Sequence, residues 1–269
     1  MIASIIIPTF NRQQLTERAI KSVFDCIGSD QVQIVIVDDC STVPFSSKLL
    51  RSHDIIIRNN KNQGASKSRQ IGIEAAEGDI IYLLDSDDYF LCRDFVLDHT
   101  IVKDTKCLYY CDRILKNSKK ITSYPDYISK DKYFDQIYWG KPPTCSFCFD
   151  SKIDVKFDEK LIDHEDWDFL YSFLEKGYQV KKIKGLVGID KNDRKSLSRA
   201  KDYKKVLPWL DKIKSTQNSQ IYDFAKFWDL SKYSRCMKLS EFVTKSIYYL
   251  IKGKIPLVFI AKRFIQRFL

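Results

Sequence analysis

Four short apolar runs alternate with two amphipathic segments in the first 85 residues, and this alternation constrains the fold more than any other feature. The runs are rich in β-branched residues, which is typical of strands buried on both faces of a sheet. They are ASIIIPT (3–9), VQIVIVDD (32–39), DIIIRN (54–59) and DIIYLLD (79–85). Residues 12–27 and 64–78 carry apolar residues at helical spacing. This order predicts an α/β fold with a doubly wound, mostly parallel sheet and helices on both faces.

Polar residues follow the C-terminal end of each predicted strand. They are Thr9, Asp38, Asp39, Asn59, Asn60, Asp85, Ser86, Asp87 and Asp88. Neighbouring parallel strands end at the same edge of a sheet, and ligands of open α/β sheets bind outside that edge. We therefore predict the functional site at this edge, which is called the rim below.

The turn between the first predicted strand and the first predicted helix contains no glycine, because Gly28 is the first glycine of the chain. This excludes the dinucleotide-binding fingerprint and the P-loop, since both need glycines where the backbone meets phosphate. A diphosphate bound at the rim therefore needs positive charge from another source.

Asp85, Asp87 and Asp88 place three carboxylates within four positions. Such close carboxylates repel one another unless a positive charge lies between them. Hard oxygen ligands suit magnesium or manganese, so the pattern favours a divalent cation here. The alternative is that Asp87 or Asp88 caps a helix over residues 89–102.

A zinc site is a second metal hypothesis, because Cys145 and Cys148 are two residues apart and Cys107 and Cys111 lie upstream. However, the segment PPTCSFCF (142–149) is typical of a strand, in which residues three apart face opposite sides. This geometry suits a shared zinc poorly. The sequence therefore disfavours zinc.

The net charge of +10 is concentrated near the end of the sequence, since residues 231–269 contain nine Lys or Arg and one acidic residue. Within it, the segment PLVFIAKRFIQRFL (256–269) separates an apolar face from a basic face. Such a helix is typical of a membrane interface. Binding of nucleic acid is disfavoured because these basic residues are not part of a recognisable nucleic-acid-binding motif. The alternative to membrane contact is that this helix packs on the rest of the protein.

Several segments together resemble family 2 glycosyltransferases of the GT-A fold. They are SIIIPTFNR, IVIVDDCS, NKNQGASKSRQIGIEAAEGDIIYLLDSDD and FDEKLIDHEDWDFLYSFLEKGYQV, which are spread in the family's order over residues 1–184. The resemblance implies inverting transfer of a sugar from a nucleotide-sugar donor, commonly a UDP-sugar, to a hydroxyl of a glycan or lipid-linked acceptor in surface-polysaccharide synthesis. The resemblance also implies a bacterial enzyme. The eight cysteines, with no secretory signal among the first residues, lead us to expect a cytoplasmic protein. With the amphipathic segment 256–269, we expect it at the inner face of the cell membrane.

The resemblance also assigns donor-site roles to residues at the rim. The assigned residues are Pro8, Thr9, Phe10, Asp39, Gly64, Arg69, Asp85, Ser86 and Asp87. Asp39 would accept from the imide nitrogen of uracil, Asp85 would face the ribose, and Asp87 would bind Mn²⁺ or Mg²⁺. From the residues alone, Arg69 is equally compatible with a solvated helix position, and Asp38 with a structural role that fixes a loop through backbone N–H groups.

The segment DHEDWDF (163–169) supplies the predicted chemistry. Sugar transfer needs a general base for the acceptor hydroxyl, and the family's Glu-Asp pair matches Glu165 and Asp166, with Asp166 as the base. The alternative is that these acids only complement the dipole of the helix that follows. Trp167 fits either a sugar-stacking or a core position, and His164 fits an orienting role or none.

The chain departs from related enzymes at the histidine that often follows the Glu-Asp helix. None of its three histidines lies downstream of Asp166. That region is basic instead, and Arg194 with Lys195 would neutralise the diphosphate directly.

We expect a catalytic domain over residues 1–200 and a basic helical extension over residues 201–269. Two other functions stay open. A sugar-nucleotide nucleotidyltransferase shares this kind of sheet, although it usually has a glycine-rich first loop. A glycan-binding protein on an inactive transferase scaffold would not need the acidic residues at positions 39, 87 and 166.

Overall fold

The computed structural model describes residues 3–27, 32–91, 106–115, 121–134, 136, 140–189, 203–217, 219–231, 238–255, 257, 260 and 261. The chain divides into two compact units. The sheet unit comprises residues 1–159 and 165–196, and the helical unit comprises residues 160–164 and 197–269. The helical unit therefore contains a short segment, 160–164, that we had expected in the catalytic domain.

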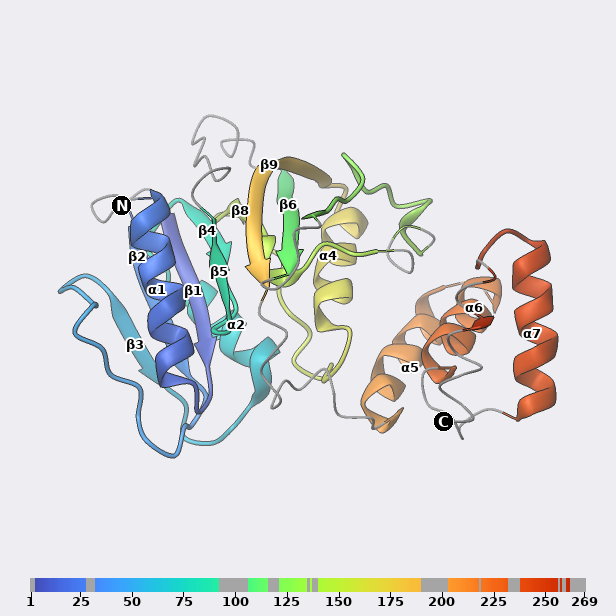
Figure 1. Ribbon diagram of the computed structural model, residues 1–269, viewed down its shortest axis with the longest axis horizontal. Helices are drawn as coiled ribbons and strands as arrows, with labels where there is room; N and C mark the ends of the chain where they lie inside the picture. The colour runs from blue at the N-terminus through green and yellow to red at the C-terminus, as the bar shows by residue number, and fades with distance from the viewer. Residues whose placement is uncertain are drawn as a thin grey trace. The chain divides into compact units, whose positions relative to one another are not determined.

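The first half of the sheet is parallel, with strand order β3-β2-β1-β4 (Figure 1). Its strands are β1 (Ala3–Thr9), β2 (Val32–Asp38), β3 (Ile55–Arg58) and β4 (Ile80–Leu83). In this register, Ile5 of β1 lies between Ile34 of β2 and Tyr82 of β4. The four strands coincide with the four apolar runs of the sequence and confirm the predicted α/β class.

Helices cover both faces of this parallel half. Alternate residues of β1 and β2 form one core with α1 (Gln13–Ile27). On the other face, α2 (Gly64–Glu74) lies so close to the sheet that a Cβ atom at Gly72 would be 2.3 Å from Ile6 Cγ2. Burial on both faces explains why β1 and β2 are continuous apolar runs, since each fully buried aliphatic side chain contributes about 1.5–3 kcal/mol. The same expectation is wrong for β3, at the end of the strand order, which is only partly buried and has Ile56 42% exposed.

The second half of the sheet is mixed and continues the order as β4-β8-β6-β9-β5. Its strands are β5 (Asp88–Phe90), β6 (Cys107–Leu115), β7 (Ile121–Thr122), β8 (Cys148–Asp150) and β9 (Gln179–Ile189). The pair β6–β9 is parallel, whereas β4–β8, β6–β8, β5–β9 and β6–β7 are antiparallel. Helix α4 (Glu165–Glu175) packs Phe169 and Phe173 against Phe149 of β8.

Two local expectations are wrong. Asp88 does not begin a helix, because residues Asp88–Phe90 pair with β9; residues 92–102 of that expected helix lie outside the described part of the chain. The segment 142–149 is not one continuous strand either, since Thr144–Ser146 forms a 3-10 turn (η1) before β8. Cys145 and Cys148 are fully buried, and this burial raises the pKa of both thiols.

The helical unit is built around aromatic side chains. Its helices are the 3-10 turn η3 (Tyr203–Val206), α5 (Leu207–Thr216), α6 (Ser219–Leu230) and α7 (Leu239–Ile251). The ring of Phe227 lies 6.1 Å from that of Phe242 and 5.1 Å from that of Tyr249. None of the described helices has both the length and the apolar character needed to cross a bilayer.

Candidate active site

Asp38, at the end of β2, fixes the loop that follows it. Its Oδ1 accepts a hydrogen bond from Ser41 N at 2.9 Å, and its Oδ2 accepts one from Phe45 N at 3.0 Å and pairs with Arg58 at 2.6 Å. Burial alone would raise the pKa of Asp38, but the hydrogen bonds from Ser41 and Phe45 and the charge of Arg58 together lower it. Asp38 therefore has the structural role that the sequence left open.

Asp39, the predicted uracil reader, connects β2 to the start of α2. It accepts hydrogen bonds from Asn59 Nδ2, Gln63 N and Gly64 N, each at 2.8 Å. Gly64 has a φ of +86°, a left-handed conformation that favours glycine. A carboxylate offers about four acceptor positions, so Asp39 retains capacity for one ligand donor.

The residues at the end of β1 differ in what they present. Thr9 is buried, and its hydroxyl lies 2.7 Å from the hydroxyl of Thr16. Pro8 is buried as well, whereas Phe10 is 43% exposed. Of these three residues, to which the family resemblance assigns a place beside the base and ribose of the donor, only Phe10 offers an exposed side chain for stacking.

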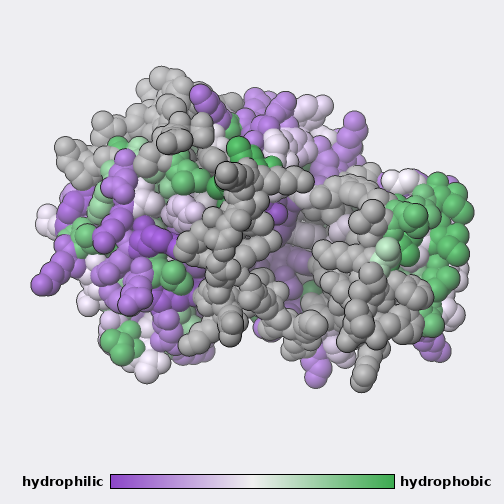
Figure 2. All heavy atoms as spheres, in the orientation of Figure 1, coloured by the Kyte–Doolittle hydropathy of each residue, from purple (hydrophilic) through white to green (hydrophobic). Residues whose placement is uncertain are grey.

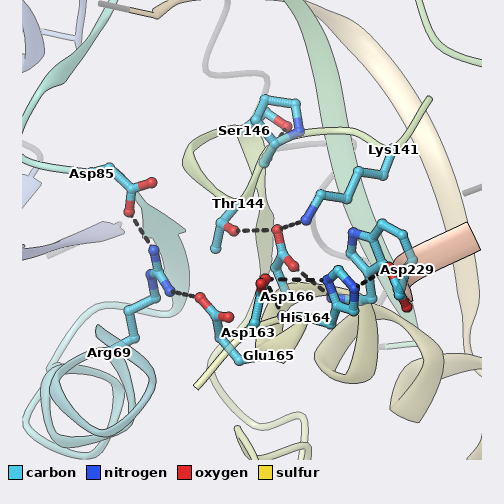
Figure 3. A network of polar contacts seen from close by, with 12 residues as sticks. Arg69, Asp85, Lys141, Thr144, Ser146, Asp163, His164, Glu165, Asp166 and Asp229 are labelled. Carbon is cyan, nitrogen blue, oxygen red and sulfur yellow. Dashed lines mark hydrogen bonds and ion pairs between the residues drawn. The ribbon is translucent and has the colours of Figure 1, made fainter. Parts of the chain in front are cut away.

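Arg69 connects the donor-site residue Asp85 at the rim with the predicted Glu-Asp pair on α4 (Figure 3). Its guanidinium pairs with Asp85 Oδ1, after β4, at 2.6 Å and with Glu165 Oε1, at the start of α4, at 3.2 Å. Burial alone would lower the pKa of Arg69, but the charges of Asp85 and Glu165 raise it, so Arg69 stays protonated. A buried arginine between two carboxylates is not the solvated helix residue that the sequence allowed.

Asp87, the predicted metal ligand, pairs with Arg12 at 3.1 Å. Two arginines, Arg12 and Arg69, thus supply positive charge to the acidic segment after β4. The repulsion that favoured a cation there is therefore relieved in part by protein side chains. In the part of the chain that the structure describes, no three His, Cys, Asp or Glu residues are grouped as metal ligands.

The residues still fit a metal that needs few protein ligands. Magnesium commonly takes one or two carboxylates and completes its shell with phosphate oxygens and water. Asp87 is partly exposed and could supply one such oxygen if Arg12 moved aside. Ser86, beside it, is buried.

Asp166, the predicted base, is held by residues that the sequence did not indicate (Figure 3). Its Oδ2 pairs with Lys141 Nζ and accepts a hydrogen bond from Thr144 Oγ1 at 3.3 Å, while Oδ1 accepts one from Trp167 N at 2.9 Å. Burial, with the adjacent charge of Asp166, raises the pKa of Glu165 despite the opposing charges of Arg69 and Lys141. The Glu-Asp pair thus lies between two cations.

The neighbours of this pair have different surroundings. Trp167 is buried, which places it in the core rather than on an open sugar-binding face. His164 belongs to the helical unit, where its Nε2 lies 2.9 Å from Asp229 Oδ1. Arg194 and Lys195 lie outside the described residues, so their predicted contact with the diphosphate remains a prediction.

A cavity of about 560 Å³ adjoins the rim at Thr9. It is lined by residues 9, 11–13 and 41–46. None of the carboxylates at positions 39, 85, 87 and 166 lines it. This cavity therefore extends the rim on the side of α1, and Arg12 connects its lining to Asp87.

A family model described as Glycosyl transferase family 2 matches residues 4–150, which is more than half of the chain. The chain belongs to glycosyltransferase family 2. The matched range contains the parallel half of the sheet and the rim residues up to Asp87.

Similar proteins include a Campylobacter jejuni GalNAc(5)-diNAcBac-PP-undecaprenol beta-1,3-glucosyltransferase, 36% identical over 94 residues, which are 33% of this chain and 30% of that protein. The putative colanic acid biosynthesis glycosyl transferase WcaA of Escherichia coli is 40% identical over 92 residues, covering 32% of this chain and 33% of its own. The matched segment thus spans about a third of these relatives.

A longer match is the Escherichia coli UDP-Glc:alpha-D-GlcNAc-diphosphoundecaprenol beta-1,3-glucosyltransferase WfaP, 25% identical over 67% of this chain and 73% of that protein. Among solved structures, S. aureus TarS 1-349 in complex with UDP-GlcNAc has a TM-score of 0.63 at 18% identity. That match covers 90% of this chain and 77% of the TarS chain. It shows that the two proteins share a fold.

Proposed function

We propose that this glycosyltransferase moves a sugar, with inversion, from a UDP-sugar to a hydroxyl of a glycan or lipid-linked acceptor during surface-polysaccharide synthesis. The names of two relatives support the acceptor class, since both contain an undecaprenol-linked diphosphate. The name of WfaP contains UDP-Glc, and the solved TarS structure is a complex with UDP-GlcNAc. Both names support UDP as the nucleotide of the donor. The observation that carries the proposal is the Arg69 bridge, which brings Asp85 of the donor side beside the Glu-Asp pair.

In this proposal, inversion follows from a single displacement. The acceptor hydroxyl attacks the anomeric carbon while Asp166 takes its proton, and the bond to the UDP oxygen breaks. A carboxylate is basic enough for this step because a diphosphate is a good leaving group. Asp39 and Phe10 would hold the base. Arg69 would hold Asp85 and Glu165 in place, and its charge would favour the ionised form of Glu165.

Two rival functions are less well supported. Family membership and the glycine-free first loop argue against a sugar-nucleotide nucleotidyltransferase. A non-catalytic glycan-binding protein would not need a carboxylate held between Lys141 and Thr144 at the predicted base position.

A panel of nucleotide sugars tests the proposal. We expect one UDP-sugar to raise the melting temperature and to be hydrolysed slowly to UDP. Protection by glycans without hydrolysis of any nucleotide sugar would favour the binding protein instead, and protection by a nucleoside triphosphate with a sugar phosphate would favour the nucleotidyltransferase.

We further propose that a divalent cation, Mn²⁺ or Mg²⁺, binds with the donor and that Asp87 holds it. Such an ion would neutralise the charge of the leaving diphosphate. We expect Mn²⁺ to increase the melting-temperature shift caused by UDP, and Asp87→Ala to abolish only this metal-dependent increase.

Asp79→Ala is the matched control, because Asp79 is an exposed acid before the other end of β4. The control should respond to Mn²⁺ like the parent protein. An undiminished Mn²⁺ effect in Asp87→Ala would show that Asp87 is not a ligand.

The basic extension is our candidate for contact with an anionic membrane. Most of the predicted helix 256–269 lies outside the described residues, but α7 exposes an apolar surface at its side, visible as the green area over α7 in Figure 2. Its exposed residues are Leu239, Val243, Ile247, Tyr248, Leu250 and Ile251. Apolar burial, with about 1 kcal/mol for each basic residue near anionic lipid, would hold such a surface at the bilayer.

We expect full-length protein to float with anionic vesicles, and removal of residues 256–269 or Ile247→Glu to reduce this flotation. Raised salt should weaken it, since charges are screened beyond about 10 Å at 0.1 M salt. Ile121→Glu is the control, because Ile121 is similarly exposed on β7. Equal flotation of all variants, or unfolding on truncation, would refute the membrane proposal; self-association lost in Ile247→Glu would point to a second copy of the chain.

A further inference from the structure

Lys141 is the residue nearest to the predicted base that no sequence motif indicated. It lies just before η1, and its ammonium pairs with Asp166 Oδ2. The same ammonium lies 5.1 Å from the centre of the Trp167 ring, a cation–π distance. Because Trp167 follows Asp166 on α4, the lysine contacts two consecutive residues of that helix.

Several charged groups interact with Asp166. Lys141 approaches from the segment before η1, Glu165 precedes Asp166 on α4, and Arg69 approaches from α2. Arg69 is already engaged by Asp85 and Glu165 at 2.6 and 3.2 Å. Within the described part of the chain, Lys141 therefore has a direct ion pair with Asp166 that does not depend on Arg69.

Without Lys141, the adjacent carboxylates Glu165 and Asp166 would lose one of the two cations beside them, and the remaining one, Arg69, also pairs with Asp85. Adjacent carboxylates resist joint ionisation, and one of them then retains a proton at higher pH. A general base must be ionised to accept a proton. The positive charge of Lys141 thus bears directly on whether the Glu-Asp pair can supply a base near neutral pH.

We propose that Lys141 is a positioning residue that keeps Asp166 ionised and orients its carboxylate. The inference rests on the proposed role of Asp166 as the base. Thr144 assists by donating to the same oxygen, so the segment from Lys141 to η1 forms one wall around the carboxylate.

The direct test is a carboxyl ¹³C NMR titration of Asp166, with its signal assigned from Asp166→Asn. Lys141→Met keeps an unbranched stem against Trp167 and removes the charge, so the titration midpoint of Asp166 should rise by about 1 pH unit. Lys141→Arg should restore the parent value. Lys152→Met, at an exposed lysine after β8, is the matched control and should change nothing.

An unchanged midpoint in Lys141→Met, or an equal shift in Lys152→Met, would overturn the inference. Activity separates this result from the proposed function. The rate of UDP release would be measured against pH with UDP-glucose or UDP-GlcNAc, whichever the enzyme hydrolyses. In Lys141→Met, the acid limb of this pH–rate profile should move to higher pH together with the NMR midpoint of Asp166. If the midpoint rises while the acid limb stays, Lys141 controls Asp166 as inferred, and the base assignment fails instead.

Discussion

Asp166→Asn should lower kcat for sugar transfer by about 10²–10⁴-fold, the usual contribution of a positioned general base. Asparagine keeps the shape of the side chain, and its one carbonyl oxygen can still accept the hydrogen bond from Trp167 N. Its NH2 group then faces Thr144 Oγ1 as a donor. It cannot take the proton of the acceptor hydroxyl. The loss should therefore fall on kcat, and the dissociation constant of UDP, measured by calorimetry, should stay at the parent value.

Asp154→Asn is the matched control, because Asp154 is 80% exposed and pairs only at the surface with Lys176. It should retain the parent activity. Glu165→Gln distinguishes the two members of the pair. If Glu165→Gln abolishes transfer while Asp166→Asn transfers sugar near the parent rate, the base is Glu165.

Arg69→Met should destabilise the sheet unit by about 3 kcal/mol at neutral pH, the lower end for breaking a buried ion pair. The lower end applies because Asp85 and Glu165 keep partial access to water, at 30% and 19% side-chain exposure. The substitution leaves both carboxylates without their shared cation. Burial already raises the pKa of Glu165, and loss of the opposing charge of Arg69 would raise it further.

The sign of the pH dependence follows from this direction. A protein becomes less stable as pH rises through the raised folded-state pKa of one of its carboxylates. The loss of unfolding free energy in Arg69→Met, relative to the parent protein, should therefore be largest at neutral pH. It should shrink on acidification, as Glu165 takes up a proton. Urea unfolding at several pH values measures both effects.

Lys67→Met is the control on the same helix, since it breaks an exposed pair with Glu159. Exposed pairs contribute only about 0–1 kcal/mol. A deficit in Arg69→Met no larger than that of Lys67→Met, or one that does not depend on pH, would show that Arg69 does not bridge the site.

The parallel half of the fold could be predicted from sequence because its physics is local. Strands buried on both faces must be continuous apolar runs, and β1 and β2 are buried at every position. Parallel strands also end at one edge, so Asp39 and Asp85 could be placed at the rim before any contact was known. The structural role of Asp38 was left open by the sequence, and the backbone hydrogen bonds from Ser41 and Phe45 support it.

The mixed half of the sheet could not be predicted in this way. Strand β5 has three residues and pairs with β9, about 100 positions later in the chain. Such a short strand carries no periodic pattern of its own. Strand β8, which contains Cys148, also has only three residues and therefore no periodic pattern of its own. The apolar run of residues 142–149 did not indicate the 3-10 turn that precedes this strand.

The countercharges of the site were also beyond the sequence. Lys141 and Asp166 are 25 positions apart, and Arg12 and Asp87 are 75 positions apart. Neither pair has helical or strand spacing, so only the fold brings them together. Close carboxylates need positive charge nearby, but the sequence did not show that Arg12 and Arg69 supply part of it.

The most direct test of the proposed function is the anomeric configuration of the product. The UDP-sugar that protects the enzyme in the donor panel would be incubated with a hydroxyl-bearing lipid-diphosphate sugar acceptor, and the new linkage determined by NMR. We predict stoichiometric release of UDP and a linkage with the anomeric configuration opposite to that of the donor, both abolished in Asp166→Asn. Retention of configuration, or a folded enzyme that releases UDP from no nucleotide sugar, would contradict the proposal.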